Sequence, residues 1–481
     1  AGKRNSIHAA CPNAGVDTFK RSDYPQLAIA GAAESPCRED VPLNDSQPAP
    51  HPSRSARRAI YTAIFAILAL TVSVPFLSDT TTEWNEVYAA AANRLAQGED
   101  LYPLHTNYTY PPFMAGVAYG VEAFGPTLGR ILWLAINLIA VSFMIRWGWW
   151  LAGGRAWPDR PRDDAIFFLG LLCGLRYVLN GFSHLQTDMV IASLMVGGCV
   201  AVARGRSIAS GLAFGLATAI KGPAFLWMGY LLYRRQFQSA GVMVVTILLA
   251  SLLPDLIHPE PTGSIWLARW FQAKASLVDR DHHYPGVWAS AIENNQSISG
   301  LVCRSLVGQW EKRDGEYLSR VVESESVSPG GMKSIIYLIE SALAIATLVG
   351  FIRAGRLLPS TRRWAIEASL VLTLIVLVSP MSSKPHFASM ILPGWVLARG
   401  AIEREYRSSA GFLMLALFGL NLGWNFWGDD VEFFALWIGA VTLGTAALWA
   451  GSLALLLFPA TPRSNARHTT PSNPTTLPQA A

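Results

Sequence analysis

The sequence predicts an all-α, polytopic membrane protein with about twelve transmembrane helices and two larger loops. Of its 481 residues, 51% are hydrophobic and only 15% are charged, whereas a soluble chain of this length carries about a quarter charged residues. Apolar runs of roughly 15 to 25 residues, the length that crosses a bilayer, recur along the chain. The net charge of +5, from 38 basic and 33 acidic residues, collects in short clusters beside these runs. This arrangement is typical of membrane topology and predicts no nucleic-acid partner.

Polar tails flank the apolar part of the chain. Residues 1–57 are rich in Pro, Ser, Ala and Asn and show no apolar period, which predicts a disordered tail. Arginines at its end, just before the first apolar run, place this tail in the cytoplasm. Residues 58–458 form the predicted transmembrane domain, and residues 459–481 form a second disordered tail.

The positions of the basic clusters orient the spans. With Phe113 to Gly125 as a helix lying at the outer interface, every basic cluster falls on the inner side, as positive residues do. Segments 79–126 and 258–333 are then the two large outer loops. The predicted spans are 59–78, 127–149, 165–180, 188–203, 207–220, 222–234, 238–257, 334–353, 363–380, 386–400, 409–427 and 431–458.

The first outer loop carries two candidate catalytic carboxylates, Glu83 and Glu86, three residues apart. Either could be an acid that the helix dipole favours near a helix start. Either could also be a partly desolvated general base that takes a proton from a sugar hydroxyl. The turn Tyr110-Pro111-Pro112 closes this loop. Its prolines restrict the backbone, so we expect the turn to position the loop.

Further polar residues fall at outer ends of the spans. Gln186 and Asp188 lie between the third and fourth spans, where Asp188 could also be a helix cap. Lys221 precedes Gly222-Pro223 at a break in an apolar run. This lysine could extend toward the membrane surface or contact a phosphate. Small residues at Gly211 and Gly215, four apart, indicate close helix packing.

The second outer loop and a later turn complete the set. Asn295, Gln296 and Arg304 lie in the second loop, and His386 ends the polar run 379–386. His386 could be a buried structural histidine or could assist at a phosphate. One base, several cations and amides suited to sugars, all on one side of the membrane, predict group transfer from an anionic lipid donor.

The sequence predicts no metal ion and no nucleotide cofactor. Asp279, Asp281, His282 and His283 invite a metal-site interpretation, but adjacent side chains do not readily chelate one ion with good geometry. A Gly-rich phosphate loop between a strand and a helix is also missing from the sequence pattern.

In their order along the chain, these motifs resemble glycosyltransferase family 87. The resemblance covers about residues 59–400. Two positions depart from the family pattern, which usually has Asp where this chain has Glu83 and often has Gly where it has Leu185. The residues that carry the resemblance are Glu83-Trp84, Tyr88, Ala90-Ala91, Gly98, Tyr102, Tyr110-Pro111-Pro112, Gln186, Lys221, Pro223, Asn295-Gln296-Ser297, Arg304, Ser379-Pro380, Ser382 and His386.

The resemblance implies a helical bundle of the GT-C type and a hexosyltransferase activity in the cell membrane. A polyprenyl-phosphate sugar, mannose in this family, would be the donor, and a hydroxyl of a glycolipid or glycan the acceptor. Transfer would take place on the extracytoplasmic face with inversion. Glu83 would be the base, and Lys221, Arg304 and His386 would stabilise the departing phosphate. Gln186, Asp188, Asn295 and Gln296 would complete the donor site.

Two alternatives remain open from the sequence. A solute or lipid transporter would need charged residues at the middle of the membrane on discontinuous helices, whereas these residues fall at outer helix ends. A ligase or polymerase of lipid-linked glycans could use a similar bundle.

Overall fold

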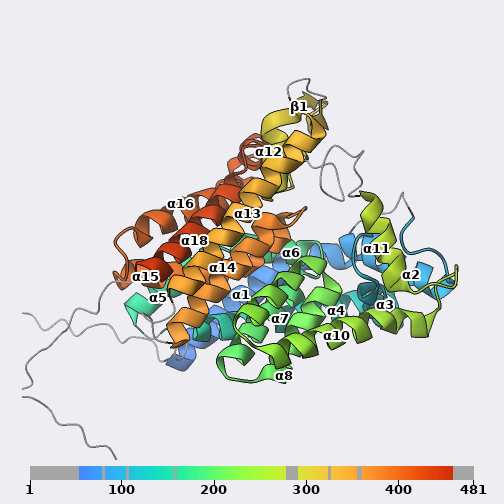
Figure 1. Cartoon of the computed structure of the whole chain (residues 1–481), viewed down its shortest axis with the longest axis horizontal. Helices are drawn as coiled ribbons and strands as arrows, with labels where there is room; N and C mark the ends of the chain where they lie inside the picture. The colour runs from blue at the N-terminus through green and yellow to red at the C-terminus, as the bar shows by residue number, and fades with distance from the viewer. Residues whose placement is uncertain are drawn as a thin grey trace, which may run out of the picture. The chain divides into compact units, whose positions relative to one another are not determined.

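The computed structural model describes residues 54–78, 82–103, 108–154, 158, 160–277, 291–322, 327–354 and 360–458. All of them belong to one compact unit, Pro52–Ala481. Residues 1–53 and 459–481, which make up nearly all of the predicted tails, lie outside the described residues. The described part is almost entirely helical, as predicted, with one two-stranded antiparallel sheet (Figure 1).

The elements follow one another as short and long helices. They are α1 Arg54–Ser78, η1 Trp84–Ala89, α2 Ala90–Gln97, α3 Pro112–Glu122, α4 Pro126–Leu151, α5 Pro161–Leu172, α6 Leu175–Ser183, α7 Asp188–Ala203, α8 Ser207–Ile220, η2 Gly222–Phe225, α9 Leu226–Tyr233, α10 Phe237–Ile257, α11 Trp266–Leu277, α12 Ile298–Val307, β1 Gly308–Arg313, β2 Glu316–Val321, α13 Pro329–Arg353, α14 Ser360–Val378, η3 Lys384–Met390, α15 Ile391–Ile402, α16 Ser409–Asn421, η4 Asn425–Trp427, α17 Asp429–Trp437 and α18 Ala440–Leu457.

Several predicted spans are not single helices, and glycines explain the breaks in two of them. The span predicted at 165–180 is a bent pair, α5 and α6, whose axes differ by 49°. A Cβ at the intervening Gly174 would lie 2.4 Å from Ile391 Cγ1, so the tight packing of α15 explains the small residue at the break. The span predicted at 431–458 is also two helices, because Gly439 adopts a φ of +73° between them, a value that favours glycine.

The number of membrane-length helices is smaller than predicted. Among the described residues, four helices are long and apolar enough to cross a bilayer, or five if the α5–α6 pair counts as one span. They are α4, α10, α13 and α18. Helices α7, α8 and α16 have 16, 14 and 13 residues, and a helix rises only about 1.5 Å per residue against a core of about 30 Å. The chain is a multi-pass membrane protein, and the count of twelve is not confirmed.

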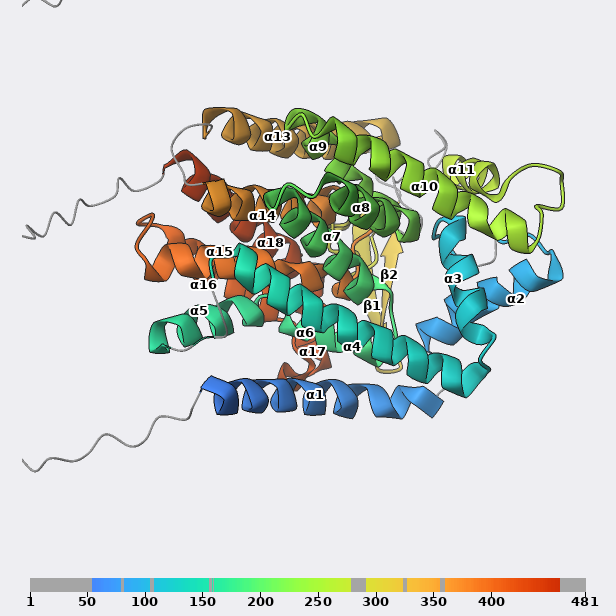
Figure 2. The same ribbon diagram turned by 90° about the horizontal axis from the view of Figure 1, so that it is seen from below.

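Helix α8 packs closely between α7 and α10. A Cβ at Gly211 would lie 2.5 Å from the backbone oxygen of Ser239 on α10, and a Cβ at Gly215 would lie 2.5 Å from Thr246 Cβ. The prediction of close helix packing at these two glycines is therefore confirmed. Figure 2 shows α1 and α13 at opposite edges of this bundle.

We expect Gly211→Ala to destabilise the protein by about 1–3 kcal/mol, because its new methyl group would push against helix backbone. Gly241→Ala, on the same helix pair, is the matched control. A Cβ at Gly241 meets no atom within 4 Å, so this change gains helix propensity without a clash. Thermal unfolding in detergent should show opposite shifts for the two variants, and equal shifts would contradict the close packing.

The segment 258–333, predicted as a long loop, contains α11, α12 and the hairpin β1–β2 in the described residues. The hairpin turns at Asp314-Gly315, where both residues have positive φ values of 54° and 88°. Asp-Gly is a preferred sequence for this turn, so the sequence contained the signal. Tyr317 of the hairpin stacks on Phe433 of α17, with ring centroids 3.9 Å apart.

Candidate functional site

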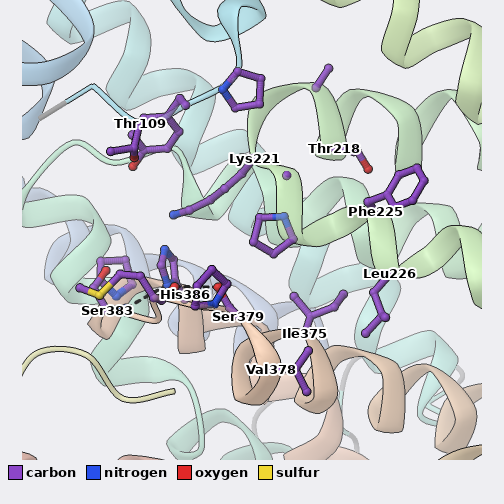
Figure 3. Close-up of a pocket in the computed structure, with 18 of the residues that line it drawn as sticks. Thr109, Thr218, Lys221, Phe225, Leu226, Ile375, Val378, Ser379, Ser383 and His386 are labelled. Carbon is purple, nitrogen blue, oxygen red and sulfur yellow. Dashed lines mark hydrogen bonds between the residues drawn. The ribbon is translucent and has the colours of Figure 1, made fainter. Parts of the chain in front are cut away.

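A cavity of about 1070 Å³ opens among the helices, with a polar end and an apolar end. Figure 3 shows Lys221, Ser383 and His386 on one side and Phe225, Ile375 and Val378 on the other. The polar lining includes Glu83, Thr109, Tyr110, Asn180, His184, Gln186, Thr218, Lys221, Ser251, Asn294, Ser299, Ser379, Ser383, Lys384 and His386. We call the side with Phe225, Leu226, Ile375 and Val378 the apolar arm (Figure 3). The other apolar lining residues include Ile247, Leu248, Leu267, Trp270, Phe271, Ile336 and Tyr337, with Glu340 among them.

Glu83 lies at the polar end as the residue that precedes the π-helix η1. Its carboxylate accepts hydrogen bonds from the Gln186 side-chain amide and from the Tyr110 hydroxyl, the latter at 3.2 Å. Tyr88 donates to the Tyr110 hydroxyl at 2.7 Å behind it. Burial raises the pKa of Glu83 above its ordinary value, although the nearby Lys221 ammonium opposes this shift. Glu83 is therefore a desolvated carboxylate at the cavity wall, with an elevated proton affinity.

Two tryptophans fix the position of Glu83 relative to Gln186. Trp84 is fully buried, stacks on Trp133 with ring centroids 4.8 Å apart, and donates to Glu122 at 2.7 Å. Trp133 in turn donates to the backbone oxygen of Leu185 at 2.9 Å. Because Leu185 precedes Gln186, the same aromatic pair positions both residues of the carboxylate–amide contact.

Leu185 has a φ of +52°, in the left-handed region that costs a non-glycine residue about 1–2 kcal/mol. This conformation gives a physical reason for glycine at this position in the family that the sequence resembles. Here the buried leucine side chain is retained in spite of the strain, and the turn still presents Gln186 to Glu83.

A second cluster of polar side chains at the cavity consists of Lys221, Asp188 and His386. Lys221 directly follows α8 and donates to both oxygens of Asp188, at 3.0 and 3.3 Å. His386 Nε2 lies 3.6 Å from Asp188 Oδ1. Its Nδ1 accepts the backbone N–H of Ser383 at 2.9 Å, which leaves the proton on Nε2 of the neutral ring, toward Asp188. Lys221 Nζ also lies 5.3 Å from the centre of the Tyr110 ring.

The structure thus brings together Glu83, Tyr110, Pro111, Gln186, Lys221 and His386 on one cavity, with Asp188 directly behind. Glu86 is exposed and is not among the lining residues. Pro112 begins α3.

Asn295, Gln296 and Arg304 have a different environment from the one predicted. All three are buried and none lines the cavity. Asn295 donates to the Pro380 carbonyl and accepts the N–H of Ser382, at 3.2 Å each. Gln296 bonds backbone oxygens of Glu293 and Leu436, at 2.5 and 2.6 Å. These side chains hold the start of α12 against the 380–382 turn and the end of α17.

Arg304 donates to backbone carbonyls of Ile292, Asn295 and Trp437 at 2.8, 2.5 and 3.0 Å. Burial lowers its pKa to about 10. The guanidinium therefore satisfies main-chain acceptors away from the cavity lining, and its predicted contact with a phosphate stays a prediction.

We expect Arg304→Met to reduce the free energy of unfolding by about 2 kcal/mol or more, because it leaves buried carbonyls without donors. Arg320→Met, at an exposed hairpin position, should change it by less than about 0.5 kcal/mol. Thermal unfolding in detergent compares the two variants. A selective loss of affinity for undecaprenyl phosphate in folded Arg304→Met, without loss of stability, would contradict this structural role.

A family comparison then identifies the chain. The model of glycosyltransferase family 87 matches residues 108–380, more than half of the sequence. The chain belongs to glycosyltransferase family 87. This confirms the resemblance drawn from the motifs.

Two curated relatives of this family 87 protein come from Mycobacterium tuberculosis. One is a polyprenol-phosphate-mannose-dependent alpha-(1-2)-phosphatidylinositol mannoside mannosyltransferase, 23% identical over 252 residues, covering 47% of this chain and 55% of the relative. The other is the corresponding phosphatidylinositol pentamannoside enzyme, 23% identical over 216 residues, covering 41% and 49%. The chain spans about half the length of these relatives. The crystal structure of ArnT from Cupriavidus metallidurans bound to undecaprenyl phosphate is 14% identical, with a TM-score of 0.40 and coverage of 84% and 77%.

The cavity of this family 87 protein includes residues to which the sequence pattern gave no role. Asn180, His184, Lys384 and Trp270 all line it. Lys384 lies within the polar run 379–386, and His184 is two residues before Gln186, so position in the sequence could have indicated both. Asn180 and Trp270 lie inside α6 and α11, where nothing in the sequence marks them.

In the described ranges, no group of three His, Cys, Asp or Glu side chains could hold a metal ion. Asp279, Asp281, His282 and His283 lie outside the described residues. The prediction that this family 87 protein uses no metal or other cofactor remains a prediction.

Proposed function

We propose that this protein transfers a hexose, mannose in the first instance, from a polyprenyl-phosphate donor to a hydroxyl of a glycolipid or glycan. The reaction would take place on the extracytoplasmic face of the cell membrane. The observation that carries the proposal is the position of Glu83 at the polar end of a cavity whose other end is apolar. A carboxylate base, a lysine and an apolar arm in one space match an amphipathic donor with an anionic leaving group.

The proposed reaction has one displacement step. Glu83 takes the proton of the acceptor hydroxyl, and the acceptor oxygen forms a bond to the anomeric carbon of the donor sugar. The bond from that carbon to the phosphate oxygen breaks, and its electron pair leaves with the polyprenyl phosphate. Attack from the face opposite the phosphate inverts the anomeric configuration, so a β-linked donor gives an α-linked product.

The surroundings of Glu83 support its role as the base. Burial raises its pKa, and a base with a pKa nearer the working pH accepts a proton more effectively. The hydrogen bonds from Gln186 and Tyr110 hold the carboxylate in place. Besides making these hydrogen bonds, the Glu83 side chain lines the cavity.

The phosphate would lie toward Lys221, which Asp188 holds at the cavity wall, with His386 beside the same carboxylate. An ammonium preorganised near a developing phosphate charge stabilises the transition state. The leaving group is already part of the donor, so the proposed step requires neither a nucleotide nor a divalent metal. The apolar arm along Phe225, Leu226, Ile375 and Val378 has the character needed for the first isoprene units of the donor.

The direct test uses the purified chain in lipid vesicles with radiolabelled polyprenyl-phosphate mannose and a mixture of mannosylated glycolipid acceptors. We expect a labelled glycolipid with an α-linkage, together with release of polyprenyl phosphate. If the protein consumes no polyprenyl-phosphate sugar with any acceptor, the proposal is wrong. Flux of the intact donor across the vesicle membrane, without a new glycosidic bond, would favour the transporter. Growth of lipid-linked glycan chains would favour the polymerase or ligase.

A further inference from the structure

A cluster of two cations and one carboxylate reaches the polar end of the cavity through one of its members, Lys384. Lys384 Nζ donates to Glu432 Oε1 at 2.5 Å, and Arg176 Nη2 donates to the same oxygen at 2.9 Å. The side chains of Arg176 and Glu432 are 6% and 10% exposed, whereas that of Lys384 is 22% exposed. With one negative and two positive groups, the cluster carries a net charge of +1.

Lys384 is the member of this cluster that lines the cavity, while Arg176 and Glu432 do not. If the Lys384 ammonium moved to a ligand, Glu432 would keep its bond from Arg176, so no buried carboxylate would be left unpaired. Arg176 also has a buried Nη1 with no hydrogen-bond partner in the described part of the chain. The two cations of the cluster thus share a single carboxylate. The Lys384 ammonium can turn to a ligand in the cavity while the Arg176–Glu432 ion pair stays intact.

The other lysine at the cavity is in a different electrostatic state. Lys221 shares both oxygens of Asp188, and that pair is neutral as a whole. His184, which also lines the cavity, has its pKa lowered by burial and by the Lys384 ammonium, so this ring is a neutral hydrogen-bonding group at pH 7. The surplus positive charge therefore belongs to the cluster of Lys384, whereas Lys221 interacts with the Glu83 carboxylate as well as with Asp188. Coulomb attraction is stronger in a partly buried site than in bulk water.

We propose that Lys384, assisted by His184, binds a substrate phosphate as an anion subsite separate from Lys221. The choice of a phosphate as the anion rests on the proposed function. An ammonium can donate up to three hydrogen bonds, and the described structure uses one of those of Lys384, toward Glu432. Two sources share this chemistry: the phosphate of the polyprenyl donor and the phosphodiester of a phospholipid-anchored acceptor.

Binding measurements separate the two sources without depending on transfer. The purified full chain in detergent would be titrated with undecaprenyl phosphate in one arm and with phosphatidylinositol in the other. Lys384→Met should weaken binding of one or both probes by roughly tenfold or more, the loss expected for a charge-assisted contact. An effect in the first arm assigns the subsite to the donor, an effect in the second assigns it to the acceptor, and equal effects assign it to both.

Three further variants complete the test. Lys312→Met is the matched control, because Lys312 also donates to a carboxylate, Asp430, at 2.5 Å but lies on the exposed hairpin. It should leave both affinities unchanged. Lys384→Arg should retain binding within about threefold, because it keeps the charge. If Lys384→Met fails to fold, Lys384→Gln replaces it, since the amide can still donate to Glu432 without the positive charge.

The proposal is overturned if the folded uncharged variant binds both probes within twofold of wild type, or if wild type binds neither. Its failure can be told apart from failure of the proposed function. Lys384-dependent phosphate binding without any sugar transfer would leave the subsite standing and remove the transferase proposal. Sugar transfer with no dependence of either affinity on Lys384 would do the reverse.

Discussion

Glu83→Gln is expected to lower the rate of sugar transfer by at least about 10²-fold, because it removes the proposed proton acceptor while nearly preserving shape. Glu86→Gln is the matched control, three residues away and exposed, and it should retain nearly full activity. The assay is transfer from radiolabelled polyprenyl-phosphate mannose in vesicles. Loss of activity only in Glu86→Gln would move the base to that residue, and full activity in both variants would remove the proposed mechanism.

The raised pKa of Glu83 adds two further expectations. Transfer needs the ionised form, so the acid limb of the pH–rate profile should lie above the ordinary pKa of a glutamate. In stability, the folded chain holds this proton more tightly than the unfolded chain. The group therefore favours folding below the unfolded pKa, and that contribution is lost as the pH rises through the folded pKa. At pH 7, Glu83→Gln should consequently raise the thermal unfolding temperature, and the difference should shrink as the pH falls.

Asp188→Asn is expected to lower kcat by about 10- to 100-fold through the groups that Asp188 positions. The change removes the anion that holds Lys221 and faces His386. The Lys221 ammonium would then lose its closest counter-charge and interact more strongly with Glu83. The negative charge of Asp188 also helps to raise the pKa of Glu83, so the substitution should move the acid limb of the pH profile to lower pH.

This displacement of the acid limb separates a positioning role from simple destabilisation. A destabilised protein would lose amplitude without a change in the pH at which activity falls. Asp100→Asn is a useful control, because Asp100 also holds a cation, Arg269, in a bidentate pair but is not among the groups that shift the pKa of Glu83. It should leave the acid limb in place. An unchanged acid limb in Asp188→Asn would contradict the proposed coupling between Asp188 and Glu83.

Local sequence signals predicted much of the bundle. The ends of α7 and α8 agree with the predicted spans 188–203 and 207–220, because an acid begins the first helix and Gly222-Pro223 follows the second. The breaks between α5 and α6 and between α17 and α18 were missed. A glycine within an apolar run does not reveal whether the helix continues, since the answer depends on a packing partner such as Ile391 beside Gly174.

The site was predictable where a polar residue stands alone at the end of an apolar segment, as Glu83, Lys221 and His386 do. It was not predictable where polar residues satisfy distant backbone groups. Asn295 and Arg304 have side chains that could equally bind a ligand, and only their contacts with Pro380 and Trp437 show a structural role. Those partners lie about 85 and 133 positions further along the chain, so no local pattern contains them.

The residues around the cavity also fix when the site can exist during biosynthesis. Glu83 is made early, Gln186 and Lys221 follow, and His386 comes last among these wall residues. At roughly 5–20 residues per second, the ribosome needs on the order of 15 to 60 seconds between the first and the last of them. A chain interrupted before His386 would therefore carry the carboxylate without a complete cavity. The membrane would receive a product whose cavity lacks part of its wall, and the proposed site would be complete only after His386 has been synthesised.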